Sequence, residues 1–250
     1  MTAPPSRHSP LARMAEGYWV ESRRPLASLV FIAPWLVVYE AGVLLLGPTE
    51  VRNGADALLR DVLGRLGFGQ YFLLPVLTAC VLLGWHYTTR QTWRLSRGLL
   101  WGMGGECLLL SICLWLLAQV QGLVLQIPPV PTGSVAQDAF RTVGRAVSFL
   151  GAGIYEELLF RLILLSAVVW GLTRLKLKPR SRTIVAVLLT SLLFAGAHYV
   201  GEHGDLLNWY SFLFRFLAGT FFAVLFLYRG FGIAAGAHAG YDMLAGLFPN

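Results

Sequence analysis

Three groups of ionisable and aromatic side chains interrupt long apolar segments in the second half of the sequence. They are Glu156 and Glu157 followed by Arg161, then Phe194 with His198, and then His238 with Asp242. A charged side chain in the hydrocarbon core of a bilayer costs roughly 2.5 to 3.5 kcal/mol on insertion scales, so intramembrane charges are candidates for function by default. These three motifs therefore nominate the chemical site of the protein.

The two adjacent glutamates of the first motif are expected to differ in role. On a helix, Glu157 and Arg161 are four residues apart, share a face and can form an ion pair. Glu156 points about 100° away from that face and need not share the arginine. Because an unpaired carboxylate facing a cavity suits a general base, we assign catalysis to Glu156 and a supporting role to Glu157 and Arg161.

The second and third motifs each place two side chains on one helical face. Phe194 lies four residues before His198, and His238 lies four residues before Asp242. Small residues surround both motifs and allow neighbouring helices to approach closely. We therefore expect Glu156, His198, His238 and Asp242 to converge in one pocket within the bilayer, with Phe194 in support.

A carboxylate and two imidazoles in one pocket favour the hydrolysis of an acyl bond, with a peptide as the leading substrate. The carboxylate can deprotonate a water molecule, and an imidazole can donate a hydrogen bond to the oxyanion that forms. The same side chains are also ligand types for zinc with an open position for water. The sequence contains no H-E-x-x-H and no G-x-S-x-G, so the zincin layout and a serine nucleophile are poorly supported.

The composition indicates the elements that must position these residues. Of the 250 residues, 56% are hydrophobic and only 13% are charged, against about 25% charged in soluble domains. A water-facing globule and a disordered chain are therefore excluded, and an all-α, polytopic bundle of transmembrane helices is predicted. We expect about seven spans, with eight as the alternative, near 26–47, 71–87, 98–126, 147–171, 184–200, 208–228 and 231–248.

The basic residues fall between the apolar segments and predict an orientation. With seven spans, 13 Lys and Arg lie on the side of the N-terminus and 5 on the other. The positive-inside rule then places the N-terminus in the cytoplasm. We expect a cytoplasmic tail over 1–25, N-terminal spans and loops over 26–146, and a catalytic membrane core over 147–250. The net charge of +7 is thus assigned to topology, and no nucleic-acid partner is expected.

The three motifs, taken in order, resemble those of a known family. Glu-Glu-x-x-x-Arg, Phe-x-x-x-His and His-x-x-x-Asn/Asp on successive late helices are the pattern of the CPBP intramembrane endopeptidases, the CAAX protease and bacteriocin-processing or Abi family. This family is similar to the type II CAAX prenyl endopeptidase. The resemblance covers about 147–248 and implies that Glu156 and His198 activate water while His238 and the last motif residue stabilise the oxyanion.

The sequence departs from the Asn of the third motif, because Asp242 stands in its place. An ionised Asp cannot donate a hydrogen bond to an oxyanion. Either Asp242 is protonated, or it orients His238, or it helps to hold a metal. In the last case Glu156, His198, His238 and Asp242 would bind a divalent ion such as zinc. The sequence alone does not establish that a cofactor is bound.

The resemblance implies a peptide or protein substrate, lipidated or otherwise bound to the membrane, and a place in the lipid bilayer of a bacterial inner (plasma) membrane. Two other functions remain open: a non-catalytic immunity or scaffold protein of the same fold and, less favoured, a proton-coupled transporter. Glu40 and Glu106 lie in spans outside the motifs. Each is expected to pair with a polar group across the bundle, with Arg215 as a candidate partner.

Overall fold

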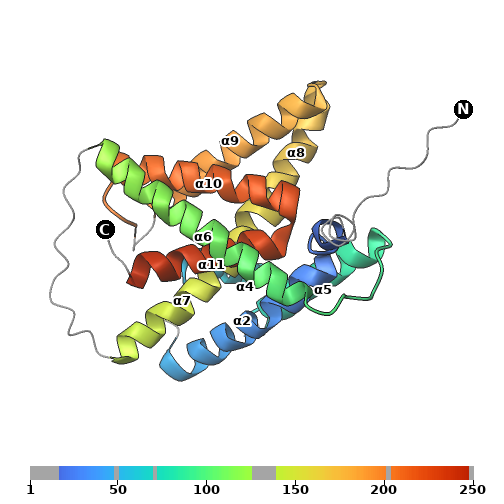
Figure 1. Cartoon of the computed structure of the whole chain (residues 1–250), viewed down its shortest axis with the longest axis horizontal. Coiled ribbons are helices and arrows are strands. Elements are labelled where there is room, and N and C mark those ends of the chain that lie inside the picture. Colours follow the sequence, from blue (N-terminus) through green and yellow to red (C-terminus); the bar gives the residue numbers. More distant parts are fainter. Residues whose placement is uncertain (1–16, 48–50, 70–71, 126–138, 201–203, 248–250) are drawn as a thin grey trace, which may run out of the picture.

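The computed structural model describes residues 17–47, 51–69, 72–125, 139–200 and 204–247, so most of the expected tail over 1–25 lies outside it. Throughout these residues the protein is a bundle of helices, which confirms the predicted fold class (Figure 1). In chain order the elements are α2 (Pro25–Leu46), α4 (Gly54–Arg65), α5 (Leu73–Thr88), α6 (Leu99–Val124), α7 (Ala139–Glu157), η1 (Leu158–Leu165), α8 (Ser166–Leu172), η2 (Thr173–Leu175), α9 (Pro179–Ala197), α10 (Trp209–Arg229) and α11 (Phe231–Leu247).

The span count differs from the expected seven. In the described part of the chain, five helices are long and apolar enough to cross a bilayer: α2, α6, α9, α10 and the continuous helix from Thr142 to Leu175. The other two expected spans are the helices α5 and α11, of 16 and 17 residues. At 1.5 Å per residue both are shorter than the roughly 30 Å of a hydrocarbon core.

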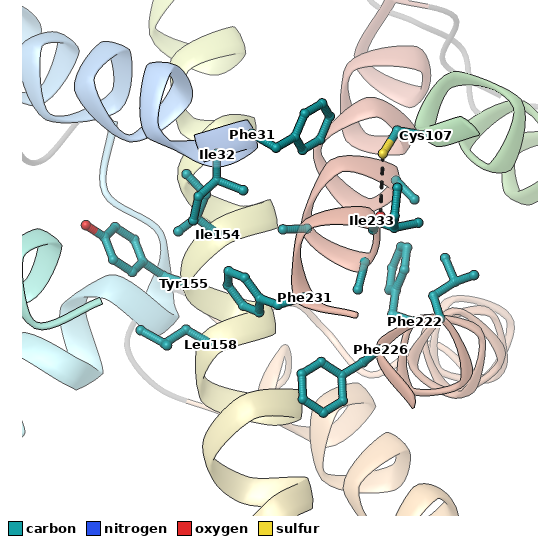
Figure 2. Packing of buried hydrophobic residues seen from close by; sticks show 14 of the residues in the cluster. Phe31, Ile32, Cys107, Ile154, Tyr155, Leu158, Phe222, Phe226, Phe231 and Ile233 are labelled. Atoms are coloured by element: carbon teal, nitrogen blue, oxygen red, sulfur yellow. Dashed lines mark hydrogen bonds between the residues drawn. The ribbon is translucent and has the colours of Figure 1, made fainter. Parts of the chain in front are cut away.

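Helix α11 is enclosed by protein, which explains why its sequence is small and apolar. It packs against α2, α6, α7 and α10 (Figure 1). Every residue from Phe231 to Ala239 is buried. The close approach depends on small residues, since a Cβ on Gly153 of α7 would lie 2.6 Å from the carbonyl oxygen of Ala235. Figure 2 shows the contact with α6, where the Cys107 thiol lies 3.7 Å from the carbonyl oxygen of Ile233.

A tight turn sends the chain from α10 into this central position. Helix α10 begins after Asn208, whose side-chain oxygen accepts a hydrogen bond from the backbone N–H of Tyr210 at 2.9 Å. It ends at Gly230, which has a φ of +84° that other residues rarely adopt. Because α11 begins at the next residue, the third motif is returned directly toward the first two.

The first motif lies where the hydrogen bonding of a long helix changes. Helices α7, η1, α8 and η2 follow one another without a break, and η1 is a π-helix of 8 residues. Glu156 and Glu157 are the last residues of α7, and Arg161 lies within η1. Such π-helical insertions are rare and are frequently found at functional sites.

Candidate active site

Glu157 lies in a fully buried position with two cationic or hydrogen-donating partners. Its Oε1 atom lies 2.9 Å from Nη1 of Arg161, so the predicted ion pair on one helical face forms. The same Oε1 accepts a hydrogen bond from Nδ1 of His238 at 2.7 Å. Glu157 therefore links the first motif to the third.

Arg161 is held on several sides within the bundle. Its Nη2 donates to the carbonyl oxygen of Gly219 on α10 at 3.1 Å. Its guanidinium carbon lies 4.3 Å from the centroid of the Phe194 ring and 5.5 Å from that of Phe222. A cation over an aromatic face is attracted by the ring quadrupole, and the attraction is larger when both groups are desolvated. Phe194 thus contributes to the site by packing on the arginine.

His238 is oriented by one hydrogen bond and one stacked ring. Because Nδ1 donates to Glu157, Nε2 is the ring atom left to face the pocket. The imidazole stacks on Phe222 with centroids 4.4 Å apart and an angle of 13° between the planes. Its Nε2 lies 3.6 Å from Oδ2 of Asp242 and 3.8 Å from Oε2 of Glu156.

His198 follows the last residue of α9 and presents the same ring atom. Its Nδ1 hydrogen bonds the carbonyl oxygen of Phe194 at 2.8 Å, which assigns the proton to Nδ1. The remaining nitrogen, Nε2, lies 4.0 Å from Oε2 of Glu156. The second motif is therefore a unit in which the aromatic residue supplies both a backbone acceptor and an edge-to-face contact at 5.0 Å.

Glu156 is the least satisfied group of the site. Its Oε2 atom is buried and has no hydrogen-bond partner among the residues that the structure describes. The two imidazole nitrogens at 3.8 and 4.0 Å are too far for direct hydrogen bonds. A polar contact of this length is the distance at which a bridging water molecule fits. The four residues expected to converge thus lie around one common space.

A cavity of about 370 Å³ opens beside His198, His238 and Asp242, and Glu156 lies behind the two imidazoles rather than in its lining. This volume is within the range of pockets that bind small ligands or side chains. Its lining combines His198, His238 and Asp242 with five aromatic rings and two arginines, which are Phe149, Phe194, Phe214, Phe222, Tyr241, Arg145 and Arg215.

Arg215 is not the partner of Glu40 or Glu106, and this expectation is wrong. It pairs with Asp205 at 2.5 Å, and its guanidinium lies 5.0 Å from the centroid of the Tyr199 ring. Both contacts come from the segment that follows α9, and Arg215 also lines the cavity. Arg215 therefore belongs to the lining of the cavity beside His198, His238 and Asp242.

Glu40 forms part of a buried network that sequence reasoning did not find. Its Oε1 accepts from Nη2 of Arg60 at 2.8 Å and from the hydroxyl of Tyr155 at 2.7 Å. Asp56 accepts from Arg60 at 2.6 Å and from Tyr39 at 2.8 Å. The available signal was the charged stretch after the first span, which folds as helix α4 and packs against α7.

Glu106 of α6 pairs with Arg229, the last residue of α10. The Nε and Nη2 atoms of Arg229 lie 2.6 and 2.7 Å from the two oxygens of this carboxylate. The Tyr18 hydroxyl donates to the same carboxylate. Burial and the neighbouring charge of Glu106 raise the pKa of Tyr18 well above its usual value, so the hydroxyl keeps its proton. As expected, both glutamates outside the motifs have partners across the bundle.

The carboxylates and imidazoles of the site are of the right kind to bind a metal ion, but their arrangement does not form a metal site. Carboxylate oxygens and imidazole Nε2 atoms face one space, and Oε2 of Glu156 is without a partner. Among the described residues, however, no group of three His, Cys, Asp or Glu side chains is arranged to hold a metal ion. The geometry therefore supports no catalytic step through a metal.

A comparison with known protein families gives one match, over the part of the chain that carries all three motifs. Residues 139–244 match the family model described as type II CAAX prenyl endopeptidase Rce1-like. No curated protein and no solved structure gives a significant match. Together with the apolar helices, the match identifies an integral membrane protein whose kind of substrate is a protein or peptide in the membrane. The predicted resemblance is confirmed: residues 139–244 match an Rce1-like family model, which is consistent with a CPBP family intramembrane protease.

Proposed function

We propose that the protein is an intramembrane endopeptidase in which Glu156 is the general base. The observation that carries this proposal is the buried Oε2 of Glu156, which lacks a hydrogen-bond partner in the described structure and faces two imidazole nitrogens at 3.8 and 4.0 Å. A desolvated acceptor of this kind is costly unless it binds something. A water molecule placed there would complete its hydrogen bonding and be ready for deprotonation.

His198 would hold the same water molecule. With Nδ1 donating to the Phe194 carbonyl, Nε2 is an acceptor that turns one water proton away from Glu156. The other water proton passes to Glu156 as the oxygen attacks the peptide carbonyl carbon. The glutamic acid then returns this proton to the nitrogen of the leaving amine as the C–N bond breaks, which restores the carboxylate.

His238 would stabilise the negative oxygen that forms during the attack. Glu157 fixes the ring through Nδ1, and a proton on Nε2 would be donated toward the oxyanion. Asp242, 3.6 Å from the same nitrogen, would stabilise the protonated ring rather than bind the oxyanion itself. In this assignment Glu157, Arg161 and Phe194 are positioning residues.

The cavity lining supports a substrate with apolar groups beside the cut bond. The five aromatic rings suit an apolar side chain or the first part of an attached lipid. A peptide or protein held at the membrane, lipidated or not, would present such groups. A direct comparison of prenylated and unprenylated substrates would decide whether prenylation is required.

The proposal is tested by cleavage of a membrane-tethered reporter peptide by the purified protein. We expect Glu156→Gln, His198→Ala and His238→Ala each to lower kcat by at least about 100-fold, the scale of general acid–base catalysis. The matched control is Asp61→Asn, because this exposed carboxylate pairs only at the surface of α4. Full activity in all three variants would overturn the assignment. Proton or ion flux in liposomes without cleavage would favour the transporter instead.

The metal alternative is tested on the same preparation. Metal analysis is combined with cleavage after treatment with a chelator. We expect cleavage to persist in metal-free protein, because Glu156 and His198 suffice to activate water in this mechanism. Stoichiometric zinc that is lost together with activity would instead assign Glu156, His198, His238 and Asp242 as ligands.

We further propose that the N-terminus lies in the cytoplasm of a bacterial cell and that the protein belongs to its inner membrane. The excess of arginine and lysine on that side supports this orientation. An N-terminal cysteine tag should be labelled by a membrane-impermeant thiol reagent only after the inner membrane is opened.

A further inference from the structure

A second cavity shares no lining residue with the first and lies beside the start of α2. It is a shallow cavity of about 640 Å³, wide open to the surface, between the turn of helix that precedes α2 and the segment joining α5 to α6. Two arginines, Arg24 and Arg94, line it from these two segments. Glu21, Thr92 and Ser96 supply further polar lining.

The cavity lies at the ends of three apolar helices. Helix α2 begins at Pro25, directly after Arg24. Helix α5 ends at Thr88 and α6 begins at Leu99. The segment that joins these two apolar helices contains Arg94 and lies at the same level as the start of α2. Three tryptophans near these ends, Trp19, Trp93 and Trp101, are more than half exposed. Exposed tryptophans at helix ends are typical of the level of lipid head groups.

The charge around the cavity is predominantly positive. Glu21 is its only acidic lining residue in the described structure, and its carboxylate is already engaged by the backbone N–H of Ser96 at 2.6 Å. Arg24 lies 3.9 Å from Glu21 and donates through Nη1 to the carbonyl oxygen of Arg94 at 3.3 Å. The Nε of Arg24 is buried and has no hydrogen-bond partner among the described residues.

The wall that precedes α2 is held in place by the bundle. Arg229, at the end of α10, donates to the carbonyl oxygen of Trp19 at 3.2 Å and to the hydroxyl of Ser22 at 2.9 Å. The same guanidinium lies 3.7 Å from the centroid of the Trp19 ring. Because these contacts fix the segment that carries Glu21 and Arg24, the cavity is formed before a ligand arrives.

We propose that this cavity binds the phosphate of an anionic phospholipid from the adjacent leaflet. Guanidinium groups bind phosphate oxygens through directed N–H donors, and basic pockets at the membrane surface bind anionic head groups. Arg24 and Arg94 are the phosphate ligands, and the neighbouring Thr92 hydroxyl is a further donor. The acyl chains follow the exposed apolar side chains at the start of α6, such as Leu100 and Trp101. The bound lipid ties the N-terminal segment to the α5–α6 connection.

The experiment measures phosphatidylglycerol bound to the full-length protein in nanodiscs of phosphatidylcholine, by native mass spectrometry and by thermal unfolding. The test variant is Arg24→Gln combined with Arg94→Gln. The matched control removes two arginines from another loop at helix ends, as Arg174→Gln with Arg180→Gln. At about 1 kcal/mol per arginine near a charged surface, the test variant should bind phosphatidylglycerol roughly 30-fold more weakly and lose its stabilisation by this lipid.

Equal weakening in the test and control variants would overturn the proposal, because diffuse attraction would then explain the binding. Unchanged binding in the test variant would overturn it as well. If the double variant does not fold, Arg94→Gln alone replaces it, since this exposed side chain is not needed for packing. Competition by free inorganic phosphate at millimolar concentration would show a site for small anions and would also contradict a lipid site.

Discussion

Two polar clusters lie within the apolar bundle, and they differ in how their carboxylates are paired. In the α4 network, defined as Tyr39, Glu40, Asp56, Arg60 and Tyr155, both carboxylates lie within 2.8 Å of one guanidinium. In the motif cluster, defined as Glu156, His198, His238 and Asp242, the two carboxylates lie 3.6 to 4.0 Å from imidazole nitrogens.

Under the proposed function, this difference would separate a structural role from a chemical one. A buried carboxylate with a guanidinium partner is stabilised in place, and removing either partner leaves an uncompensated charge. A buried carboxylate without such a partner is costly until a ligand or water binds to it. The two clusters meet on one helix, since Tyr155 belongs to the first and Glu156 to the second. Adjacent residues of α7 thus contact different clusters, and in the proposed function only Glu156 would take part in the chemistry.

The sharpest test of this comparison uses the neighbouring glutamates of the first motif. Glu157→Gln leaves the buried guanidinium of Arg161 without a full counter-charge, so we expect a loss of about 3 kcal/mol in the free energy of unfolding. Glu156→Gln removes no ion pair with an arginine and should leave stability unchanged or slightly raised. Chemical unfolding in detergent micelles measures both. Equal destabilisation by the two variants would remove the distinction between the clusters.

The α4 network is tested by Arg60→Met, which strands the carboxylates of Glu40 and Asp56. We expect a loss of about 2 kcal/mol in the free energy of unfolding, less than for a fully buried arginine because the Arg60 side chain is 13% exposed. The fraction that stays folded should retain its kcat. A fall in kcat without a fall in stability would mean that this network takes part in the chemistry.

Asp242→Asn tests whether the motif cluster needs a second negative charge. The amide keeps the shape but no longer stabilises a protonated His238, so we expect kcat to fall about tenfold, or about 1.4 kcal/mol, with KM unchanged. Reporter cleavage with purified protein provides the measurement. An Asn variant as active as the parent would instead assign this position to direct hydrogen bonding of the oxyanion.

The smallest effect is expected where the two clusters meet. Tyr155→Phe removes one hydrogen bond to Glu40 and leaves the ring in its buried place, which should cost about 1 kcal/mol of stability. Activity should change less than twofold if the α4 network only supports α7. Thermal unfolding and reporter cleavage on one preparation decide this, with Tyr228→Phe as control because that ring is exposed.

The local parts of the site were predictable because they depend on spacing along one helix. Four-residue spacing was enough to predict the pair of Glu157 with Arg161 and the shared face of His238 and Asp242. It also predicted that Glu156 would be left out of the ion pair. The helical bundle followed from composition alone, and in the described part of the chain five helices, against seven expected spans, are long and apolar enough to cross a bilayer.

The contacts between distant segments could not be predicted from spacing. The hydrogen bond from His238 to Glu157 joins positions 81 residues apart. The hydrogen bond from Tyr155 to Glu40 joins positions 115 residues apart, and helix α4, which lies between the expected spans, supplies Arg60 to the same carboxylate. Arg215 was assigned to the wrong carboxylates because the segment after α9 folds back and places Asp205 beside it.

The π-helical segment η1 resets the phase of the long helix that contains it. A π-helical turn contains more residues than an α-helical turn, so it shifts the angular position of every residue that follows. The helix face that points to the interior before Leu158 is therefore not the face that points to it after Leu165. Upstream, α7 packs on α2 and α11, whereas downstream α8 packs on α9. One continuous helix can therefore pack against two sets of neighbours through two different faces, and the glutamate pair lies where the faces change.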